Sequence, residues 1–375
     1  MIRICIDCRY IGSRPSGIGE MVQALVRFAP GLAPDCEFTF LRNAEIAGKL
    51  SAAENVTELR IKSAANGPRS MWLLPRLVDL SKINVFHAPS NILPAGLKSR
   101  TVTTIHDIMW LSHPHWCNAR MYGKIERQFY AHGIRRALKH SSHITTVSEA
   151  TRQAIIERAP ELSPKVTAVL SGVSTRFHPI AVDRQALCAL GIREGRRFVL
   201  VVGQYAPYKN HEQAIAAFAK AFGQRSGIDL VMVQRQGHGV EKLVRLAEDL
   251  GIARRILFTG PVSEATLVQL YSGASALLHP SLCEGFGNPL AEAMACGCPV
   301  ITSNRSAMPE VTNGAAQLVS PDQVDDISAA LEQVVDDREL AEQMRRAGKA
   351  RAEQLSWKDF AQRHVDIYRE VAEGA

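Results

Sequence analysis

The chain has 375 residues, of which 46% are hydrophobic, and a formal net charge of +7. This length and apolar content predict about two globular domains, each with a sizeable core. No apolar run reaches the ~18 residues that span a bilayer, and the N-terminus lacks the apolar core of a signal peptide, so we expect a cytoplasmic protein.

The positive charge is concentrated in the first half of the chain. Residues 1–180 hold 23 Lys and Arg against 13 Asp and Glu (+10), whereas residues 181–375 hold 21 against 24 (−3). A basic half favours an acidic partner, such as an anionic membrane surface or a lipid diphosphate. Nucleic acid is the alternative partner, but the sequence shows no zinc-finger spacing and no arginine tract, so we expect none.

The eight cysteines are scattered, as in a reducing compartment. Cys5 and Cys8 fall in a predicted strand, where residues three apart face opposite sides. Cys296 and Cys298 have no second pair at zinc-ligand spacing. We therefore expect no metal and no redox role.

Alternating residues at 2–7 predict a first strand, and the loop after it opens an amphipathic helix. This loop carries Gly12, Gly17 and Gly19 at the carboxyl end of the strand, which is where open α/β sheets bind ligands. Gly17 and Gly19 are therefore candidates for contact with a phosphate. Strands are predicted next at 37–41, 56–61 and 85–88, with a helix at 71–80. This alternation predicts a parallel sheet covered by helices on both faces.

The strand predicted at 101–105 ends in His106 and Asp107, again at the carboxyl edge. A lone histidine is most often structural, but a His-Asp pair that leaves a strand at the ligand edge favours a functional role. His87, within the strand predicted at 85–88, is a further candidate.

A long helix predicted at 118–139 carries six basic residues among apolar ones. A solvated face on a core helix and a membrane-surface helix explain this pattern equally well. The strand at 143–147 then leads to Ser148, which should cap the next helix. A strand at 166–170 closes the first domain, and the polar stretch with Pro179 is interpreted as the linker.

The second half starts a new series with a strand at 198–202, a turn at Gly203 and a helix at 210–222. Lys209, at the end of the loop, is placed to pair with a diphosphate, although a solvated loop lysine is the alternative. Arg235, just after the strand at 230–233, is a candidate for a second positive charge.

The segment 279–302, HPSLCEGFGNPLAEAMACGCPVIT, predicts a strand end, a glycine loop and a small-residue helix. Gly285 and Gly287 let the backbone approach a ligand closely, and Pro289 suits a first helical position. The amides from Gly287 to Leu290 should then form an anion site. Phe286 and Asn288 belong to the same predicted binding turn.

Glu284 and Glu292 place two acceptor-only carboxylates beside this anion site, where they should hold hydroxyl groups. A ligand with phosphates in the middle and sugars at both ends is a nucleotide sugar. A dinucleotide-binding dehydrogenase is the alternative, but Leu290 occupies the place of its third glycine.

Glu284 and Glu292, eight apart around GFGNPLA, resemble the paired-glutamate motif of retaining glycosyltransferase family 4, whose members have the GT-B fold. Further segments resemble the family in the right order along the chain: the N-terminal glycine loop, TIHDIMW, VSEATR, the lysine beside Asn210, and residues 303–311. Two positions depart from its pattern. Glu20 stands where arginine or asparagine is more usual, and the arginine often found near Lys209 is missing.

The resemblance implies an α/β fold of two doubly wound domains, residues 1–178 and 179–355, that face each other across a cleft. It also implies a last helix at 356–375 that packs back on the first domain. It implies that Glu292 holds ribose, that Lys209, Gly203 and the amides of residues 287–290 hold the diphosphate, and that Glu284 holds the transferred sugar. From the other domain, His106 would touch that sugar, Asp107 would orient His106 or face the acceptor, and Gly17 and Gly19 would close the site.

The expected reaction is transfer, with retention, of a hexose from a nucleotide sugar to a saccharide acceptor, without a metal or cofactor. The pattern is most similar to bacterial enzymes of surface polysaccharide or lipopolysaccharide synthesis, which suggests GDP-mannose as donor and a lipid-linked acceptor at the inner face of the membrane. A UDP-sugar or another GDP-sugar is the alternative donor. A phosphorylase, an epimerase or a nucleotide-sugar-binding protein without chemistry would be alternative functions.

Overall fold

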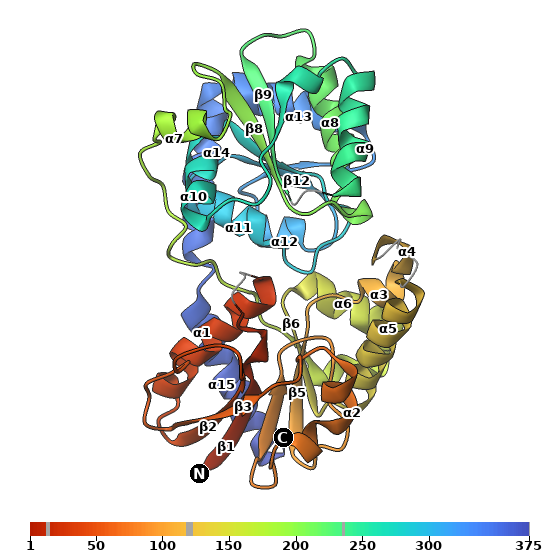
Figure 1. The fold of residues 1–375 in the computed structure, drawn as a ribbon, viewed down its shortest axis with the longest axis vertical. Helices are drawn as coiled ribbons and strands as arrows, with labels where there is room; N and C mark the ends of the chain where they lie inside the picture. Colours follow the sequence, from red (N-terminus) through yellow and green to blue (C-terminus); the bar gives the residue numbers. More distant parts are fainter. Residues whose placement is uncertain (13–15, 118–122, 235–236, 375) are drawn as a thin grey trace. The chain divides into compact units, whose positions relative to one another are not determined.

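The computed structural model describes residues 1–12, 16–117, 123–234 and 237–374. The chain divides into two compact units, one formed by Met1–Gly172 with Ser356–Ala375 and the other by Val173–Leu355 (Figure 1). The polar stretch around Pro179 lies inside the second unit. No helix in the described ranges is both long and apolar enough to cross a membrane.

The first unit is built on a seven-stranded parallel sheet in the order β3-β2-β1-β4-β5-β6-β7. The chain starts in the middle, winds outward to one edge, returns and winds to the other, so the order reverses between β1 and β4. The strands are β1 (Ile2–Asp7), β2 (Cys36–Asn43), β3 (Val56–Ile61), β4 (Val85–Ala88), β5 (Arg100–Ile105), β6 (His143–Thr146) and β7 (Val166–Ala168).

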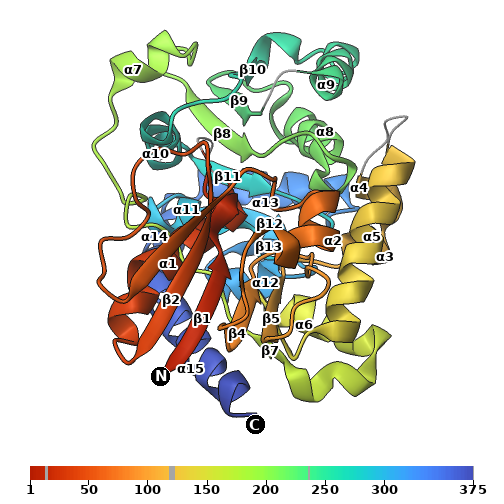
Figure 2. The same cartoon turned by 60° about the horizontal axis from the view of Figure 1, so that its bottom comes forward.

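Helices cover both faces of this sheet (Figure 2). One face packs against α1 (Gly17–Leu32) and α15 (Trp357–Glu373), which contact each other. The other face shares a core with α2 (Pro68–Leu77), α5 (Gly123–His140) and α6 (Glu149–Arg158). Two short helices, α3 (Met109–Ser112) and α4 (Pro114–Cys117), and two 3-10 turns, η1 (Cys8–Tyr10) and η2 (Pro160–Lys165), complete the unit.

Helix α15 is held on the sheet by buried polar contacts as well as apolar ones. The Tyr368 hydroxyl lies 2.6 Å from His87 Nδ1, and His87 Nε2 lies 2.8 Å from Thr104 Oγ1. The His364 ring stacks on His87 with centroids 5.4 Å apart, and burial lowers the pKa of His87 well below its ordinary value. The structure therefore places His87 in the packing between α15 and the sheet, with both ring nitrogens hydrogen-bonded.

The second unit has a six-stranded parallel sheet in the order β10-β9-β8-β11-β12-β13, with its reversal between β8 and β11. The strands are β8 (Arg197–Val202), β9 (Ile228–Val233), β10 (Ile256–Phe258), β11 (Ala276–His279), β12 (Val300–Ser303) and β13 (Gln317–Val319). The predicted α/β class with two doubly wound sheets is confirmed.

Helices again lie on both faces of the second sheet. A shared core joins one face to α8 (His211–Phe222), α9 (His238–Asp249) and α13 (Val324–Asp336). The other face is covered by α10 (Glu264–Gly273), α11 (Asn288–Ala295) and α14 (Arg338–Glu353), of which α11 contacts both of the others. The remaining elements are α7 (Arg184–Ala189), α12 (Met308–Thr312) and the 3-10 turns η3 (Pro207–Lys209) and η4 (Ala253–Arg255).

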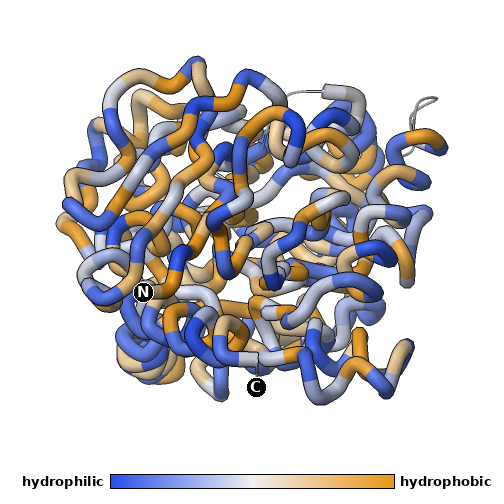
Figure 3. The backbone as a smooth tube through the Cα atoms, turned by 90° about the horizontal axis from the view of Figure 1, so that it is seen from below, coloured by the Kyte–Doolittle hydropathy of each residue, from blue (hydrophilic) through white to orange (hydrophobic). Residues whose placement is uncertain are grey.

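Hydrophobic and hydrophilic residues are interleaved along the backbone (Figure 3), which fits helices that bury one face only. The Ser148 side chain caps α6 as predicted, accepting from the Thr151 amide at 3.1 Å. Helix α2 begins at Pro68 and ends at Leu77, three residues earlier at each end than the pattern indicated, because Gly67 and Pro68 provide its start. The predicted residues 118–122, including Arg120, lie outside the described ranges.

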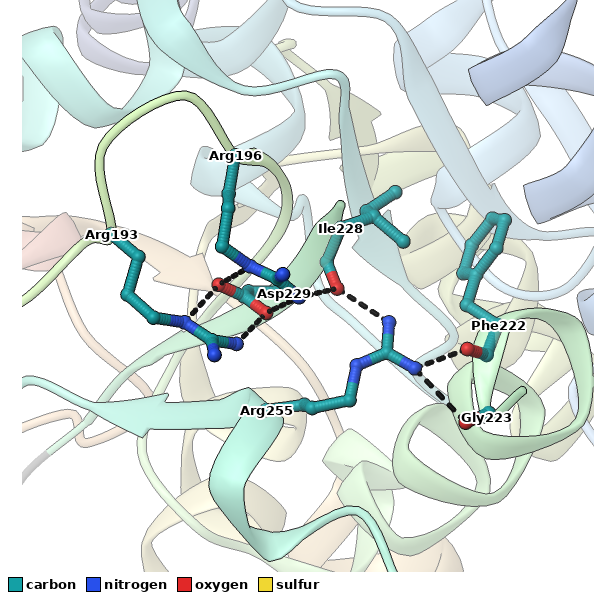
Figure 4. A network of polar contacts seen from close by, with 7 residues as sticks. All are labelled: Arg193, Arg196, Phe222, Gly223, Ile228, Asp229 and Arg255. Atoms are coloured by element: carbon teal, nitrogen blue, oxygen red, sulfur yellow. Dashed lines mark hydrogen bonds and ion pairs between the residues drawn. The ribbon is translucent and has the colours of Figure 1, made fainter. Parts of the chain in front are cut away.

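A polar network fixes the amino edge of the second sheet, near the start of β9 (Figure 4). The Asp229 carboxylate is 6% exposed and accepts hydrogen bonds from Arg193 Nε at 3.0 Å and Arg196 Nε at 2.8 Å. Arg255 donates to the carbonyls of Phe222, Gly223 and Ile228. Burial alone would raise the pKa of Asp229, but the hydrogen bonds from Arg196 and Arg193 outweigh it and lower the pKa.

We predict that Asp229→Asn lowers the free energy of unfolding by ~2 kcal/mol at pH 7, since hydrogen bonds to a charged group are lost from a buried site. Because the folded-state pKa of Asp229 is lowered, its contribution is present above its unfolded pKa of ~3.9 and is lost as the pH falls below it. Urea unfolding followed by circular dichroism at pH 7 and pH 3.5 measures both effects. Asp322→Asn removes the exposed partner of Arg305 and should cost less than ~1 kcal/mol.

Candidate functional site

The candidate site lies at the carboxyl edge of the second sheet, where its strand order reverses. Strand β8 pairs with β11, and the loops that leave these two strands carry Lys209 and Glu284. In doubly wound sheets the two loops diverge at this point and leave a crevice that binds ligands. The sequence predicted both residues as site residues, and the structure brings them into contact.

Lys209 and Glu284 form a buried ion pair. Lys209 Nζ lies 2.6 Å from Glu284 Oε1, and the two side chains are only 13% and 10% exposed. His279 Nε2 lies 3.0 Å from the same oxygen, and Ser281 Oγ lies 3.1 Å from that ring nitrogen. Lys209 and His279 thus both contact the Glu284 carboxylate, and Ser281 contacts the His279 ring.

The ionisation of this cluster follows from the balance between burial and charge. Burial alone would raise the pKa of Glu284, but the Lys209 charge and the His279 hydrogen bond hold the pKa well below its usual range. Burial lowers the pKa of His279 although Glu284 acts in the opposite direction. At neutral pH the site therefore holds one ammonium, one carboxylate and a neutral imidazole that donates to the carboxylate.

The glycine turn after Glu284 forms as the sequence predicts, with one correction. Gly287 has φ = +95° and caps α11, a backbone conformation that favours glycine. The Leu290 amide donates to the Gly287 carbonyl at 2.9 Å, and the Leu290 side chain is fully buried. Leu290 was predicted to offer a free amide, but the turn itself uses that hydrogen.

Glu292 lies on α11, one turn after Asn288, and its carboxylate is oriented by a tyrosine. The hydroxyl of Tyr271, a fully buried residue of α10, donates to Glu292 Oε2 at 2.8 Å. Burial raises the pKa of Tyr271 well above its ordinary value, so the phenol keeps its proton. Tyr271 was not predicted as a site residue because spacing in α10 gives no sign of its partner on α11.

The backbone of Glu284 is held by Ser306, another residue that the sequence did not single out. Ser306 Oγ donates to the Glu284 carbonyl at 2.7 Å and accepts from the Glu284 amide at 3.3 Å. Ser306 has φ = +53°, a strained value for a non-glycine residue, which is typical of functional loops.

The Lys209 loop is attached to its neighbours through Asn210. This residue has φ = +59°, and its Nδ2 donates to the carbonyls of Pro280 at 3.1 Å and Pro321 at 2.7 Å. Gly203, directly after β8, has φ = +145°, a backbone conformation that favours glycine, and a Cβ there would be in ordinary van der Waals contact with Lys209 Cδ and Cε. The predicted Arg235 lies outside the described residues.

His211 follows Asn210 at the start of α8 and is 2% exposed. Its Nδ1 is buried, and none of the described residues forms a hydrogen bond with it. Burial and the nearby Lys209 charge lower the pKa of His211 to about 4, so its ring is neutral at physiological pH.

The first unit places its predicted residues at the carboxyl edge of its own sheet. Gly17 and Gly19 begin α1, where Ser16 Oγ accepts from the Gly19 amide at 3.0 Å. A Cβ on Gly19 would lie 2.9 Å from Ser16 Oγ and 3.1 Å from the Tyr10 carbonyl oxygen. Glycine at position 19 is therefore already required by local packing.

His106 follows β5 and has a defined tautomer. Its Nε2 lies 2.9 Å from the Pro89 carbonyl, so Nε2 carries the proton and, in the neutral ring, Nδ1 is an acceptor. Burial lowers the pKa of His106. The Asn91 side chain accepts from the His106 amide at 2.8 Å and donates to the Asp107 carbonyl at 3.3 Å, so it positions both residues. Asp107 Oδ1 accepts from the Met109 amide at 2.8 Å.

The second unit thus offers a cation for an anionic group and two oriented carboxylates for hydroxyls. Among the residues that the structure describes, no group of three or more His, Cys, Asp or Glu side chains is arranged to hold a metal ion.

Two family models match the chain. The model described as Glycosyltransferase Family 4 matches residues 31–177, and the one described as Glycosyl transferases group 1 matches residues 185–351. Among similar proteins, the O-antigen chain mannosyltransferase B of Escherichia coli is 28% identical over 80% of this chain and 77% of its own length. The serotype-specific mannosyltransferase WbdA of Escherichia coli is 25% identical over 90% of this chain, which spans 41% of that protein.

Solved structures share the fold. Sucrose-phosphate synthase from Thermosynechococcus elongatus superposes with a TM-score of 0.76 at 18% identity, over the whole of both chains. WaaG, a glycosyltransferase involved in lipopolysaccharide biosynthesis, gives a TM-score of 0.70 at 16% identity, over 98% of this chain and 99% of its own.

We predict that Lys209→Met lowers the free energy of unfolding by ~3 kcal/mol at pH 7, because it leaves the buried Glu284 carboxylate without its cation. The substitution also raises the pKa of Glu284. The loss of stability should therefore shrink between pH 7 and pH 4.5, as protonation removes the unpaired charge. Urea unfolding followed by circular dichroism at both pH values measures this difference.

Lys220→Met is the matched control, since Lys220 pairs with Asp325 on the surface. It should cost less than ~1 kcal/mol at either pH. An equal loss in the two variants would contradict the assigned burial of the Lys209 pair.

Proposed function

Because two glycosyltransferase models together match most of the chain, it belongs to glycosyltransferase family 4, with the GT-B fold, and we propose that it transfers a hexose from a nucleotide sugar to a saccharide acceptor. The observation that carries this proposal is the buried contact between Lys209 and Glu284 at the strand reversal of the second sheet. A lysine and a carboxylate held together there suit a ligand that joins a diphosphate to a sugar.

The ion pair suggests how the donor is bound. When the diphosphate takes up the Lys209 ammonium, the Glu284 carboxylate is freed to accept hydrogen bonds from hydroxyls of the transferred sugar. Glu292, oriented by Tyr271, accepts from the ribose hydroxyls. The amide of Asn288, in the turn that Gly287 caps, supplies a further donor to the phosphates.

We propose that the reaction proceeds with retention and without a metal, through an oxocarbenium-like state. Charge that develops on the leaving diphosphate is stabilised by the preorganised Lys209 and the turn amides, and the diphosphate takes the proton of the acceptor hydroxyl. In the first unit His106 is the candidate catalytic group, because its Nδ1 is left as an acceptor by the bond to Pro89.

Mannose is the transferred hexose that the relatives favour, since the O-antigen chain mannosyltransferase B and WbdA are named as mannosyltransferases, and we propose GDP-mannose as its donor. We propose a growing surface saccharide, carried on a lipid, as the acceptor. A UDP-sugar is the second candidate donor, because structures that share the fold hold UDP and glucose.

We predict that Glu292→Gln weakens binding of the donor at least tenfold, and that Tyr271→Phe weakens it by a smaller factor, because the carboxylate remains but loses its orienting hydroxyl. Calorimetric titration with GDP-mannose, UDP-glucose and GDP alone measures this. Glu332→Gln, on the surface of α13, is the control. Unchanged affinity in Glu292→Gln would remove its proposed role, and release of free hexose from the donor by the wild type would separate an enzyme from a binding protein.

We also propose that the first unit meets an anionic membrane through α2 and α5. Helix α2 exposes a stripe at helical spacing in which Trp72 is 49%, Leu73 37% and Leu77 47% exposed, flanked by Arg69 and Arg76. The Trp72 ring lies against α5. Its centroid is 5.3 Å from the centroid of the His132 ring and 5.9 Å from the Arg136 guanidinium carbon.

The charges of these two helices support the same partner. Helix α2 holds two arginines and no acid, and α5 holds five Lys and Arg with Glu126 as its single acid. Exposed tryptophan and leucine between basic residues are typical of surfaces that lie in the lipid headgroup region. This arrangement supports a membrane-surface role for the basic helix α5 over a solvated face on a core helix.

We predict that Arg69→Gln with Arg76→Gln reduces binding to vesicles rich in phosphatidylglycerol at least tenfold, because each basic residue near such a surface contributes ~1 kcal/mol. Trp72→Ser should weaken binding further. Cosedimentation with these vesicles and with neutral phosphatidylcholine vesicles measures both effects. Arg345→Gln with Arg346→Gln, on α14, is the charge-matched control and should bind as the wild type does.

A further inference from the structure

A cavity of about 250 Å³ lies at one edge of the first sheet, beneath the loop of residues 44–55 that joins β2 to the edge strand β3. Its charged lining comprises Arg42, Lys49, Arg60 and Glu58, with the Ser51 hydroxyl beside them. Three cations against one carboxylate give the cavity an excess of positive charge. None of these residues belongs to the site described above.

Two of the cations are forced together by strand register. Arg42 on β2 is the direct partner of Arg60 on β3, so their side chains leave the sheet on the same face of neighbouring strands, ~4.8 Å apart. Like charges in such a pair destabilise a sheet unless something balances them. Arg42 is also 2% exposed, so water balances its charge poorly.

Glu58 balances the charge of Arg42 and also binds the loop above the cavity. Its Oε2 lies 3.1 Å from Arg42 Nη1, and its Oε1 accepts from the amides of Leu50 at 2.6 Å and Ser51 at 3.0 Å. Arg42 in turn donates to the carbonyls of Gly48 and Ile46. The buried pair thereby fixes the loop over the cavity and leaves Lys49 and Arg60 without an ion pair among the described residues.

Two further donors lack an acceptor. Arg42 Nε is buried and has no hydrogen-bond partner in the part of the chain that the structure describes, which costs ~1–3 kcal/mol. Ser51 Oγ accepts from the Ala53 amide at 3.2 Å, so its own hydrogen is left to donate. The unsatisfied groups of the cavity are therefore donors, and most of them are charged.

We propose that this cavity binds a phosphate-type oxyanion carried by a small molecule. Lys49 and Arg60 supply the charge, and Ser51 and Arg42 Nε supply directed hydrogen bonds. The volume lies just below the ~300–1,000 Å³ of pockets for drug-sized ligands, which fits a phosphorylated monosaccharide or a free phosphate ion. The competing explanation is that the charges only prevent β3 from pairing with another strand edge.

Calorimetric titration of the full chain with inorganic phosphate, with a hexose monophosphate and with the neutral hexose tests the proposal. The double variant Lys49→Gln, Arg60→Gln should bind the phosphorylated probes at least tenfold more weakly at this site. Tighter binding of the hexose monophosphate than of phosphate identifies a sugar phosphate as the ligand, and equal binding identifies the free ion. The neutral hexose should not bind in the cavity.

Lys62→Gln with Lys82→Gln is the charge-matched control, since both residues are exposed in the first unit and line no part of the cavity. Any phosphate that binds near Lys209 contributes equally to all variants, so their difference reports the cavity alone. Lys49 and Arg60 are exposed, and circular dichroism checks that the variant is folded. Identical titrations of the wild type and the double variant would overturn the proposal and leave the edge-protection role. The outcome is independent of donor binding and transfer.

Discussion

The candidate site depends on a single buried ion pair, between Lys209 and Glu284. Neither charge could be held in so closed a place alone, because an unpaired buried charge costs several kcal/mol. Their contact joins the loop after β8 to the loop after β11, and the parallel pairing of those strands brings the loops together. The site is therefore assembled, and kept ionised, before any ligand arrives.

Around this pair, hydrogen bonds fix backbone as much as side chains. Ser306 holds the amide and carbonyl of Glu284, Asn210 spans to the loops at Pro280 and Pro321, and Tyr271 orients Glu292. Preorganisation of this kind lets binding energy be used for recognition, since the groups do not have to be ordered first. It also explains why two residues near the site, Asn210 and Ser306, adopt positive φ values.

The two units use buried charge in different ways. In the second unit the Asp229 carboxylate lies at the amino edge of the sheet, opposite the site, and accepts hydrogen bonds from Arg193 and Arg196. Arg255 donates to the Ile228 carbonyl at the start of the same strand. In the first unit the pair of Arg42 and Glu58 fixes a loop, and the cations beside it lack partners among the described residues. The first unit also carries the basic and apolar surface of α2 and α5, in agreement with its excess of positive charge.

The sequence by itself determined the fold class and the local positions of the candidate residues. Periodicity and glycine turns predicted two parallel α/β sheets, and Glu284, Glu292, Lys209 and Gly287 were placed correctly on loops or at helix starts, because such signals are local. Only the tertiary structure decided which groups meet. Tyr271, Ser306 and Asn91 escaped prediction since their partners are distant in sequence or reached through backbone atoms. His87 was a candidate site residue but lies under α15, whose contact with β4 joins residues 281 positions apart. Local pattern specifies elements, whereas long-range packing selects which polar side chains are satisfied internally and which are left for a ligand.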